Sequence, residues 1–356
     1  MLILGIESSC DETAAAIVTD DARPDQRIVS NVVLSQEEEH RPYGGIVPEI
    51  AARSHLEHID TLIEQAMKTA NVSFADLDGI AATGGPGLIG GVIVGVMSAK
   101  AIASVQKKPF IAVNHLEGHA LTARLTSNVA FPYLLLLVSG GHCQLLIVEG
   151  VGRYKRLGTT VDDALGEAFD KCAKMMGLGY PGGPIVEAAA KQGDGTRFDL
   201  PRPMVGRQEC HFSFSGLKTA IRRQIVQLGD EAMTDQDVAD LCASFQAAAG
   251  DVLIDRCQNA LQQFRAIHPG GDTLVVAGGV AANQTLGARL ADLEASENIT
   301  LVVPPPALCT DNAAMIAWAG LEQLKAGHID PLDFKPRPRW PLDPDAPAAI
   351  GAGVKA

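Results

Sequence analysis

Short apolar runs of strand length alternate along the chain with longer segments of helical periodicity, and this alternation constrains the fold more than any other feature. The runs predicted as strands are Leu2–Ile6, Ala14–Val18, Ile80–Ala82, Ile111–Val113, Tyr133–Val138, Gln144–Val148, Leu274–Ala277 and Leu301–Val303. The segments predicted as helices are His55–Ala70, Gly90–Val105, Gly166–Met176, Asp235–Arg265, Asn283–Glu294 and Asn312–Ala326. Mixed order of this kind predicts α/β sheets covered by helices, and 356 residues are enough for two lobes.

A strand–turn–strand hairpin occurs twice. The first copy opens the chain as LILGIESSCDETAAAIV, and the second, near residue 133, reads YLLLLVSGGHCQLLIVEG. Both place small hydroxyl residues or glycine at the bend. Two unrelated hairpins would look the same, but each copy opens one half of the chain. The repetition therefore favours a duplicated fold with a cleft between its halves.

The charge balance limits how the chain could meet nucleic acid. A formal net charge of −13 repels phosphate at long range, so a nucleic acid needs a local basic patch or a partner protein. Aromatic residues make up only 4%, which argues against a base-stacking platform. Lys218 and Arg222 would share one helical face after the FSFSG turn and are a candidate strip, with an ordinary solvated helix face as the alternative.

Cysteine usage and the N-terminus indicate a cytoplasmic protein without a membrane anchor. The seven cysteines are scattered and never spaced C-x-x-C, so we expect neither a disulfide framework nor a thiolate metal site. The first apolar run is stopped by Glu7 and lacks a basic flank, unlike a signal peptide. Lys100 interrupts the most apolar stretch, Val92–Val105, and we expect no membrane span.

The segment NHLEGH carries the strongest metal signal. His115 and His119 are four residues apart and would lie on one face of a helix that follows a predicted strand. Surface histidines at this spacing are common, and the position at the carboxyl end of a strand makes the two interpretations about equal. A third ligand is needed, and the carboxylate of Asp311 could supply it. We expect Asp311 at the N-cap of the helix that ends before Gly327.

Glycine-rich turns indicate a nucleotide site. The turns are Ser139-Gly140-Gly141, Gly84-Gly85-Pro86-Gly87, Pro181-Gly182-Gly183-Pro184 and Gly278-Gly279-Val280-Ala281-Ala282-Asn283. Glycine lets backbone N–H groups approach an anion or a ribose, and a following helix N-terminus adds a favourable dipole. None of the turns matches a P-loop or a Rossmann fingerprint, and any single one would more often be structural. Their number, with two directly after strong strands, favours nucleotide binding.

Acidic residues near these turns could complete the site. Asp170 and Glu187 could accept hydrogen bonds from ribose hydroxyls, and Asp11, in the first hairpin turn, could act as a base or orient a metal-bound water. Each of these carboxylates taken alone is more often a helix cap or a surface charge.

Taken together, the motifs resemble one family, the tRNA N6-adenosine threonylcarbamoyltransferases. The matching segments span nearly the whole chain in the family's order: GIESSCDET, GGIVPEIAARSH, GPGLIGGVIVG, NHLEGH, LLVSGGHCQL, DDALGEAFDKCAKMMGLGYPGGP, FSFSGLKTA, AGGVAANQTL and CTDNAAMIAWAG. The resemblance implies the actin-like ATPase fold of the Hsp70 and sugar kinase type, with duplicated lobes around a nucleotide cleft. We accordingly expect an N-terminal lobe at 1–112 completed by 312–340, a C-terminal lobe at 113–311 with the metal and adenylate site, and a disordered tail at 341–356.

The resemblance also implies ligands for particular residues. His115, His119 and Asp311 are expected to bind one divalent ion per chain, Fe2+ or Zn2+. The residues expected to line an adenylate site are Leu137, Val138, Ser139, Gly140, Gly141, Asp170, Gly183, Glu187 and Asn283. Glu187 stands where many members of the family have aspartate, and its longer side chain could shift the contact with the ribose.

The activity that the resemblance implies is acyl transfer. The threonylcarbamoyl group of threonylcarbamoyl-AMP would pass to N6 of adenosine 37 in tRNAs that read ANN codons, forming t6A, with a metal ion polarising the carbonyl. Asp11 is the residue we expect to accept the amine proton. The implied partners are tRNA, a pseudo-homologous subunit (TsaB-like) and a small ATPase (TsaE-like).

Two other activities compete with this prediction. A metalloprotease is suggested by NHLEGH, but in the protease motif the glutamate directly follows the first histidine, whereas Glu117 would lie on roughly the opposite helix face. A sugar-kinase or Hsp70-like ATPase would share the fold, but such enzymes work with magnesium, for which histidine ligands are a poor match. A scaffold without activity would not need complete metal and glycine motifs.

Overall fold

The computed structural model describes residues 1–21, 23–229 and 233–347, which form two compact units. The first unit comprises residues 1–130, 150–153 and 310–344, and the second comprises 131–149, 154–309 and the segment that begins at 345. The sequence-based division at 112/113 differs from this one, because the helix after the fifth strand packs on the C-terminal helix of the first unit. Residues 348–356 of the expected tail lie outside the described residues, and 341–347 carry no helix or strand.

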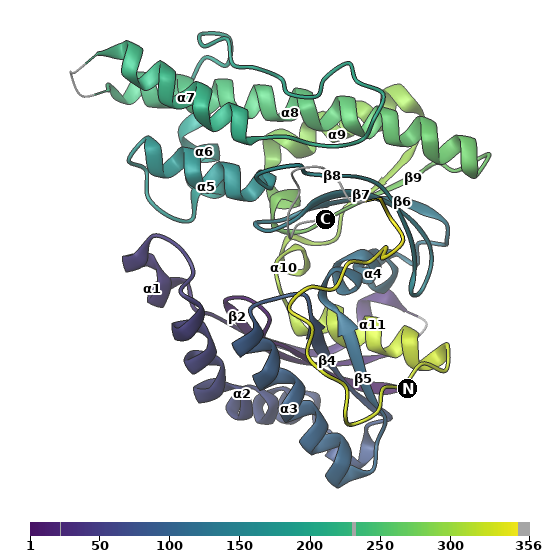
Figure 1. The fold of residues 1–356 in the computed structure, drawn as a ribbon. Helices are drawn as coiled ribbons and strands as arrows, with labels where there is room; N and C mark the ends of the chain where they lie inside the picture. The colour runs from purple at the N-terminus through teal and green to yellow at the C-terminus, as the bar shows by residue number, and fades with distance from the viewer. Residues whose placement is uncertain (22, 230–232, 348–356) are drawn as a thin grey trace. The chain divides into compact units, whose positions relative to one another are not determined.

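The first unit is a five-stranded sheet with helices on both faces (Figure 1). Its strands are β1 (Leu2–Glu7), β2 (Glu12–Thr19), β3 (Ile28–Ser35), β4 (Gly79–Gly85) and β5 (Phe110–Asn114). Its helices are α1 (Glu37–His40), α2 (Pro48–Ala70), α3 (Ile89–Gln106), α4 (His115–Ser127) and α11 (Ala313–Lys325). Leu4 and Ile6 of β1 join the core with residues of α2 and α3, whereas Gly5, on the opposite face, meets α11. This alternation is the two-residue period of a strand covered on both sides.

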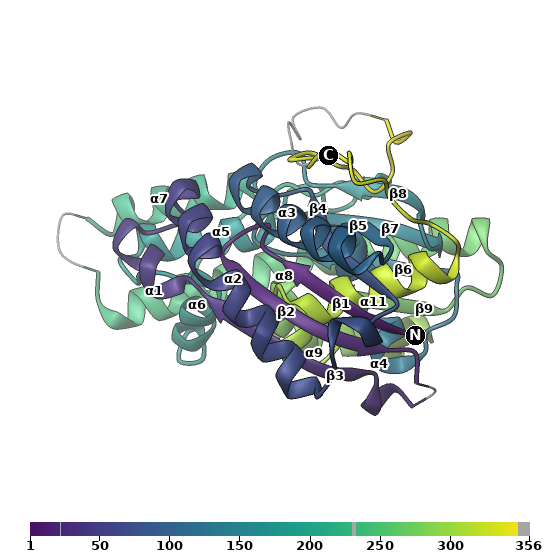
Figure 2. The same ribbon diagram turned by 90° about the horizontal axis from the view of Figure 1, so that it is seen from below.

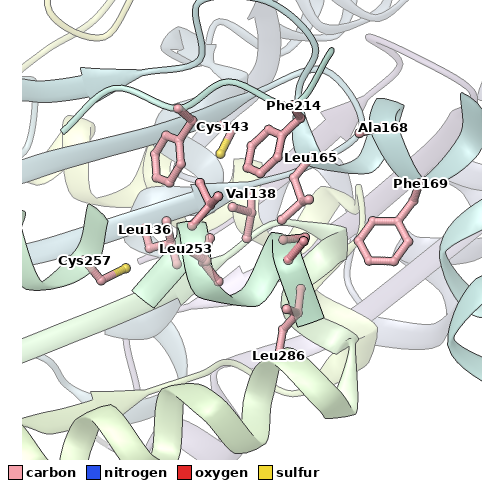
Figure 3. Close-up of a cluster of buried hydrophobic side chains, with 14 of the residues drawn as sticks. Leu136, Val138, Cys143, Leu165, Ala168, Phe169, Phe214, Leu253, Cys257 and Leu286 are labelled. Atoms are coloured by element: carbon pink, nitrogen blue, oxygen red, sulfur yellow. The ribbon is translucent and has the colours of Figure 1, made fainter. Parts of the chain in front are cut away.

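The second unit is also a five-stranded sheet with helices. Its strands are β6 (Tyr133–Val138), β7 (Cys143–Gly150), β8 (Arg153–Thr159), β9 (Thr273–Ala277) and β10 (Thr300–Val302). Its helices are α5 (Leu165–Met175), α6 (Gly182–Ala190), α7 (Ser215–Leu228), α8 (Asp235–Ile267), α9 (Gln284–Glu297) and α10 (Pro306–Cys309). Figure 3 shows side chains from β6, β7, α5, α8 and α9 meeting in one apolar cluster, which includes Leu136, Phe169 and Leu253.

The two sheets have the same topology. The strand order is β3-β2-β1-β4-β5 in the first and β8-β7-β6-β9-β10 in the second. In each, an antiparallel hairpin (β1/β2, β6/β7) is extended by a strand that runs parallel to the first hairpin strand (β1/β4, β6/β9). The duplication predicted from the two hairpins is thereby confirmed, and so is the α/β fold class.

Most predicted strands and helices are present, and the misses have physical reasons. The structure adds β3 and β8, both at sheet edges. In β8 the charged residues of RYKRLGT replace the apolar runs used to find strands, whereas β3, IVSNVVLS, is apolar but interrupted by Ser30 and Asn31. It also adds α6 and starts α2 at Pro48 rather than His55, with proline in the first helical turn. Gly327 ends α11 as predicted, with a positive φ of 81°.

Helix α3 bears on the expectation that the chain has no membrane span. Its 18 residues include Lys100, but with a mean hydropathy of 1.5 they are long and apolar enough to span a membrane by length and composition. Core helices pass the same test, and one such helix is weak evidence. Here α3 packs on β4, β5 and α2, and Lys100 donates a hydrogen bond to the carbonyl of Phe334. Ile89, Ile93 and Met97 form an exposed stripe on the same helix.

Candidate functional site

The polar residues of the first unit gather where three parallel strands end. β1, β4 and β5 are adjacent and run in the same direction, so their carboxyl ends lie at one edge of the sheet. Those ends deliver Glu7, Thr83 and Asn114. The side chain of Asn114 accepts a hydrogen bond from the N–H of Leu116, which starts α4 immediately and puts His115 in its first turn. This edge is the usual place for a ligand site in an α/β sheet.

His115, His119 and Asp311 come together as predicted. Asp311 Oδ1 lies 3.4 Å from Nε2 of His115 and 3.1 Å from Nε2 of His119, and one ligand atom from each residue falls within 4.8 Å of the others. Both histidines are buried. Two imidazole nitrogens and one carboxylate oxygen make a donor set that suits zinc or iron and leaves coordination positions for a substrate. The residues present therefore fit a divalent metal ion.

Close packing of α11 brings Asp311 to the histidines. A Cβ atom at Gly5 of β1 would lie 2.5 Å from the carbonyl oxygen of Ala313, and one at Gly118 of α4 would lie 2.9 Å from the side chain of Ile316. The prediction that Asp311 caps this helix is wrong. The cap is Asn312, whose side chain accepts from the N–H of Met315. The carboxylate of Asp311 therefore faces the histidines instead of the backbone.

Opposite charges dominate the electrostatics of this group. Burial opposes the charge of His115, but the carboxylates of Asp311 and Glu7 outweigh it and raise the pKa of His115 well above its usual value. Burial would raise the pKa of Asp311, but attraction to His115 and His119 holds it well below the usual range. The pKa of Glu7 is also lowered, because His115 outweighs the cost of burial. Without a cation, this group holds a proton that a metal would displace.

The turn after β1 adds more carboxylates. Burial, followed by repulsion from Asp311 and Asp11, raises the pKa of Glu12 to about 10. The same causes, burial first, raise the pKa of the Cys10 thiol well above its usual value, so this cysteine is no thiolate nucleophile. The predicted base Asp11 lies in this turn, half-buried, with its backbone carbonyl accepting from the N–H of Gln36. The surplus of negative charge favours a bound cation.

Glu117 is held away from the histidines' shared face. Its carboxylate is buried and accepts hydrogen bonds from the N–H of Gly152, at 2.8 Å, and from the side chain of Gln323, at 2.6 Å. In a zinc protease the glutamate must instead activate water at the metal. The geometry therefore does not support the protease alternative.

In the second unit, the turn after β6 presents backbone rather than side chains. Leu137 and Val138 are buried in the sheet, paired with Gln144 and Cys143. Ser139 closes the turn, with its N–H donating to the carbonyl of His142 and its hydroxyl accepting from the N–H of His142. The next residues, Gly140 and Gly141, are exposed, and among the described residues no atom beyond their chain neighbours lies within 4 Å of a Cβ built on either.

Helix α5 links this turn to the next predicted residues. The N–H of Gly166 donates to the carbonyl of Ser139, and a Cβ at Gly166 would lie 2.8 Å from that oxygen, so glycine permits the close approach. On the same helix, Asp170 accepts from the N–H of Gly182 at 2.7 Å, at the start of α6. Gly183 follows, and in the described part of the chain nothing but its neighbours lies within 4 Å of a Cβ built on it.

Glu187 and Asn283 meet at the N-terminus of α9. Glu187 Oε1 accepts from the N–H of Gln284 at 2.7 Å. The side chain of Asn283 caps α9 by accepting from the N–H of Leu286 and donates to Gln246. The structure thus joins the predicted adenylate residues through short contacts, while the side chains of Asp170, Glu187 and Asn283 also hold helix ends in place.

The candidate basic strip is partly neutralised. Lys218 lies 3.7 Å from Asp163, which also pairs with Lys171, whereas Arg222 is exposed. The FSFSG turn before it is organised by Asp162, whose carboxylate accepts from both serine hydroxyls and from two backbone N–H groups.

Sequence reasoning missed three residues of the first edge. Glu7 entered only as the end of an apolar run, and Ser9 and Thr83 were not singled out, yet Glu7 contacts His115, Ser9 and Thr83. A glutamate at the end of an otherwise apolar strand was the available signal, because a buried carboxylate there requires partners.

The two sheets of equal topology are those of the actin-like ATPase fold. His115, His119 and Asp311 add a candidate metal centre to it. Among solved structures, full-length HypF in a phosphate- and nucleotide-bound form has a similar fold, with a TM-score of 0.57 and 13% identity over 91% of this chain and 46% of that one. The sequence model of TsaD, tRNA N6-adenosine threonylcarbamoyltransferase, matches residues 27–318.

Close relatives carry the same name. The tRNA N6-adenosine threonylcarbamoyltransferase of Rhodospirillum rubrum is 65% identical over 99% of this chain and 98% of its own, and that of Paramagnetospirillum magneticum is 63% identical over 97% and 98%. This chain belongs to the TsaD family of tRNA N6-adenosine threonylcarbamoyltransferases. It is a transferase of tRNA modification that forms t6A, and neither the protease nor the ATPase alternative is favoured.

Proposed function

We propose that the chain takes the threonylcarbamoyl group from threonylcarbamoyl-AMP and transfers it to N6 of adenosine 37 in tRNAs that read ANN codons. The observation that carries this proposal is the convergence of His115, His119 and Asp311 at a sheet edge in a chain of this family. An exocyclic aromatic amine is a weak nucleophile, so the reaction needs an activated carbonyl and stabilisation of the charge that develops on it.

The metal would be Fe2+ or Zn2+, held by His115, His119 and Asp311. Bound there, it would supply a Lewis acid that polarises the carbonyl. The chain's own contribution is the placement of the donors: α4 carries both imidazoles, and the carboxylate of Asp311 directly precedes the cap of α11. Burial of the histidines excludes water from most of their surface and strengthens the electrostatic interactions in the site.

We place the adenylate in the second unit, against Leu137, Val138, Ser139, Gly140 and Gly141. The space in front of Gly140 and Gly141 supports this proposal, since backbone N–H groups there could hold phosphate or developing charge. Further contacts would come from Asp170, Gly183, Glu187 and Asn283, with the start of α6 at Gly182 adding a helix dipole. Asp170 and Glu187 would accept from ribose hydroxyls.

Asp11 would accept the proton that the amine loses on acylation. Its support is its position in the turn between β1 and β2, where it is half-buried beside other carboxylates. The partners would be tRNA, a pseudo-homologous subunit and a small ATPase, in the cytoplasm. The net charge of −13 supports a need for partner subunits in tRNA binding, because tRNA is a polyanion and this chain alone offers few basic contacts to it.

The direct test is to incubate the metal-loaded chain and its partner subunits with synthetic threonylcarbamoyl-AMP and unmodified tRNA. We expect t6A in digested tRNA by mass spectrometry, and none with tRNA whose adenosine 37 is replaced by guanosine. Peptide cleavage or ATP hydrolysis in the absence of t6A would instead support a protease or an ATPase.

A further inference from the structure

Glu7 is a fully buried carboxylate at the end of β1 with three polar contacts. Its Oε1 accepts from the N–H of Ser9 at 2.6 Å, and its Oε2 accepts from the hydroxyl of Thr83 at 2.6 Å. The same Oε2 lies 2.9 Å from Nδ1 of His115. A buried carboxylate is tolerated only when its oxygens receive hydrogen bonds, and these come from three separate segments of the first unit.

This contact decides how the ring of His115 is used. Nδ1 of His115 lies 2.9 Å from Oε2 of Glu7 and 3.1 Å from the hydroxyl oxygen of Ser9. A carboxylate that already accepts from two donors can only accept, so the contact with Glu7 requires the hydrogen on Nδ1, and the Ser9 oxygen can also accept from it. Without a metal the other nitrogen, Nε2, also carries a hydrogen, which faces Asp311 at 3.4 Å; a metal that displaced this proton would meet the lone pair of Nε2. A metal ligand needs that lone pair, and the hydrogen bond at the opposite nitrogen holds both the tautomer and the ring orientation.

The second histidine lacks such support. His119 points its Nε2 at Asp311, but its buried Nδ1 has no hydrogen-bond partner within the described part of the chain. Packing inside α4 and against α11 is what fixes its ring. The two imidazoles are therefore held by different means, and the effect of losing Glu7 should fall on His115.

We propose that Glu7 is a positioning residue for the metal centre, which orients His115 through Nδ1 so that Nε2 binds the ion. The inference rests on the proposed function of His115, His119 and Asp311 as ligands. Glu7 is not a fourth ligand, because Oε2 sits on the side of the ring opposite to Nε2. The competing explanation is structural: Glu7 would only join β1 to β4 through Thr83.

Zinc affinity separates the two explanations. The full chain is titrated with Zn2+ against a chromophoric chelator, and Glu7→Gln is compared with Thr83→Val, which removes the hydroxyl bond to the same oxygen but leaves His115 its partner. We expect Glu7→Gln to bind Zn2+ roughly 10–100-fold more weakly, as for other partners of metal-bound histidine. Thr83→Val should bind close to the unmodified chain. Equal weakening in both variants, or wild-type affinity in Glu7→Gln, would overturn the proposal.

Two controls separate failure of the metal site, or of folding, from failure of the proposal for Glu7. His115→Ala must lose Zn2+; if it does not, the metal site itself fails, which is a different result from failure of Glu7 alone. Should Glu7→Gln not fold by circular dichroism, the unmodified chain decides the question. In its Zn2+-loaded form, 15N spectra of labelled histidine should show Nδ1 of His115 protonated and Nε2 bound. A proton on Nε2 would contradict the assignment.

Discussion

The two units build the same sheet but finish it with different chemistry. In the first, the ends of β1 and β5 bring the buried side chains of Glu7 and His115 together with Asp311, which precedes the cap of α11. In the second, the turn after β6 exposes backbone at Gly140 and Gly141. In the first unit the polar side chains at the sheet edge already contact one another. In the second unit the backbone at the sheet edge is open to a ligand. Equivalent positions of a duplicated fold can thus be specialised independently, by side chains in one copy and by their absence in the other.

The largest effect should follow from removing a ligand in the first unit. His119→Ala and Asp311→Ala each take away a donor whose partners stay in place, so bound metal and t6A formation should fall below detection. Elemental analysis of the purified variants checks the first outcome and the tRNA assay checks the second. Full metal content in either variant would show that this edge is not the metal centre.

Adding a single methyl group should sharpen the contrast between the units. Gly5→Ala would place its Cβ against backbone atoms of α11, so we expect it to destabilise the chain by about 1–3 kcal/mol and to reduce metal binding. Gly183→Ala, where nothing lies within 4 Å, should leave the melting temperature unchanged and weaken adenylate binding. Thermal melts with and without AMP measure both. Equal melting temperatures for the two variants would contradict the comparison.

Asp170 probes whether a capping carboxylate also serves the ligand. Asp170→Ala should weaken binding of an adenylate analogue by about 1–3 kcal/mol if a buried ribose hydroxyl loses its acceptor. Because Asp170 also accepts from the N–H of Gly182, the matched variant is Asp170→Asn, which keeps an oxygen for that bond. Calorimetry on both variants gives the answer. Unchanged affinity in Asp170→Ala would place the ribose elsewhere.

Glu12 in the first unit predicts a pH dependence of stability opposite in sign to that of paired carboxylates in the second unit. One of these is Asp251, where burial would raise the pKa but Arg202 and Arg289 lower it. The pKa of Glu12 rises from 4.5 to about 10 on folding, so the folded chain holds a proton that the unfolded chain releases. The stabilisation is complete below pH 4.5 and is lost as pH rises toward 10. Glu12→Gln keeps the neutral form, so in chelator the variant should lose less stability than the wild type on going from roughly pH 6 to pH 9. Urea unfolding at both pH values measures the free energy of unfolding of each protein. An equal loss in Glu12→Gln and in the wild type would refute the prediction.

The smallest effect concerns tRNA. Since Lys218 is already paired with Asp163, reversing it together with the exposed Arg222 should weaken tRNA binding modestly and reduce its salt dependence. Filter binding of the assembled complex at several salt concentrations tests this, with adenylate affinity as the control. If the double variant Lys218→Glu with Arg222→Glu binds tRNA with the wild-type affinity and salt dependence, this surface is an ordinary solvated helix face.

The sequence predicted the elements of both sheets best where strands were apolar and helices periodic. It also predicted that His115 and His119 lie together near Asp311, because histidine spacing and a preceding strand are local signals. It could not predict the cap of α11, since Asp311 and Asn312 are both good capping residues and only tertiary packing decides between them. The contacts of Glu7 were equally hidden, because Ser9, Thr83 and His115 come together only through strand order. Edge strand β8, RYKRLGT, lacks the apolar signal, and in β3, IVSNVVLS, Ser30 and Asn31 interrupt it.

The placement of α11 has a consequence for how the protein is made. This helix covers β1, β2, β4 and β5, yet it is the last helix that the structure describes (Figure 2). During translation, the second unit has all its strands before α11 leaves the ribosome, whereas the first sheet waits with one face open. Until residue 311 and the helix after it emerge, the nascent chain has both histidines but lacks Asp311. A ribosome stalled before that point would therefore hold a chain in which the later half is folded and the earlier half is still exposed to chaperones and proteases.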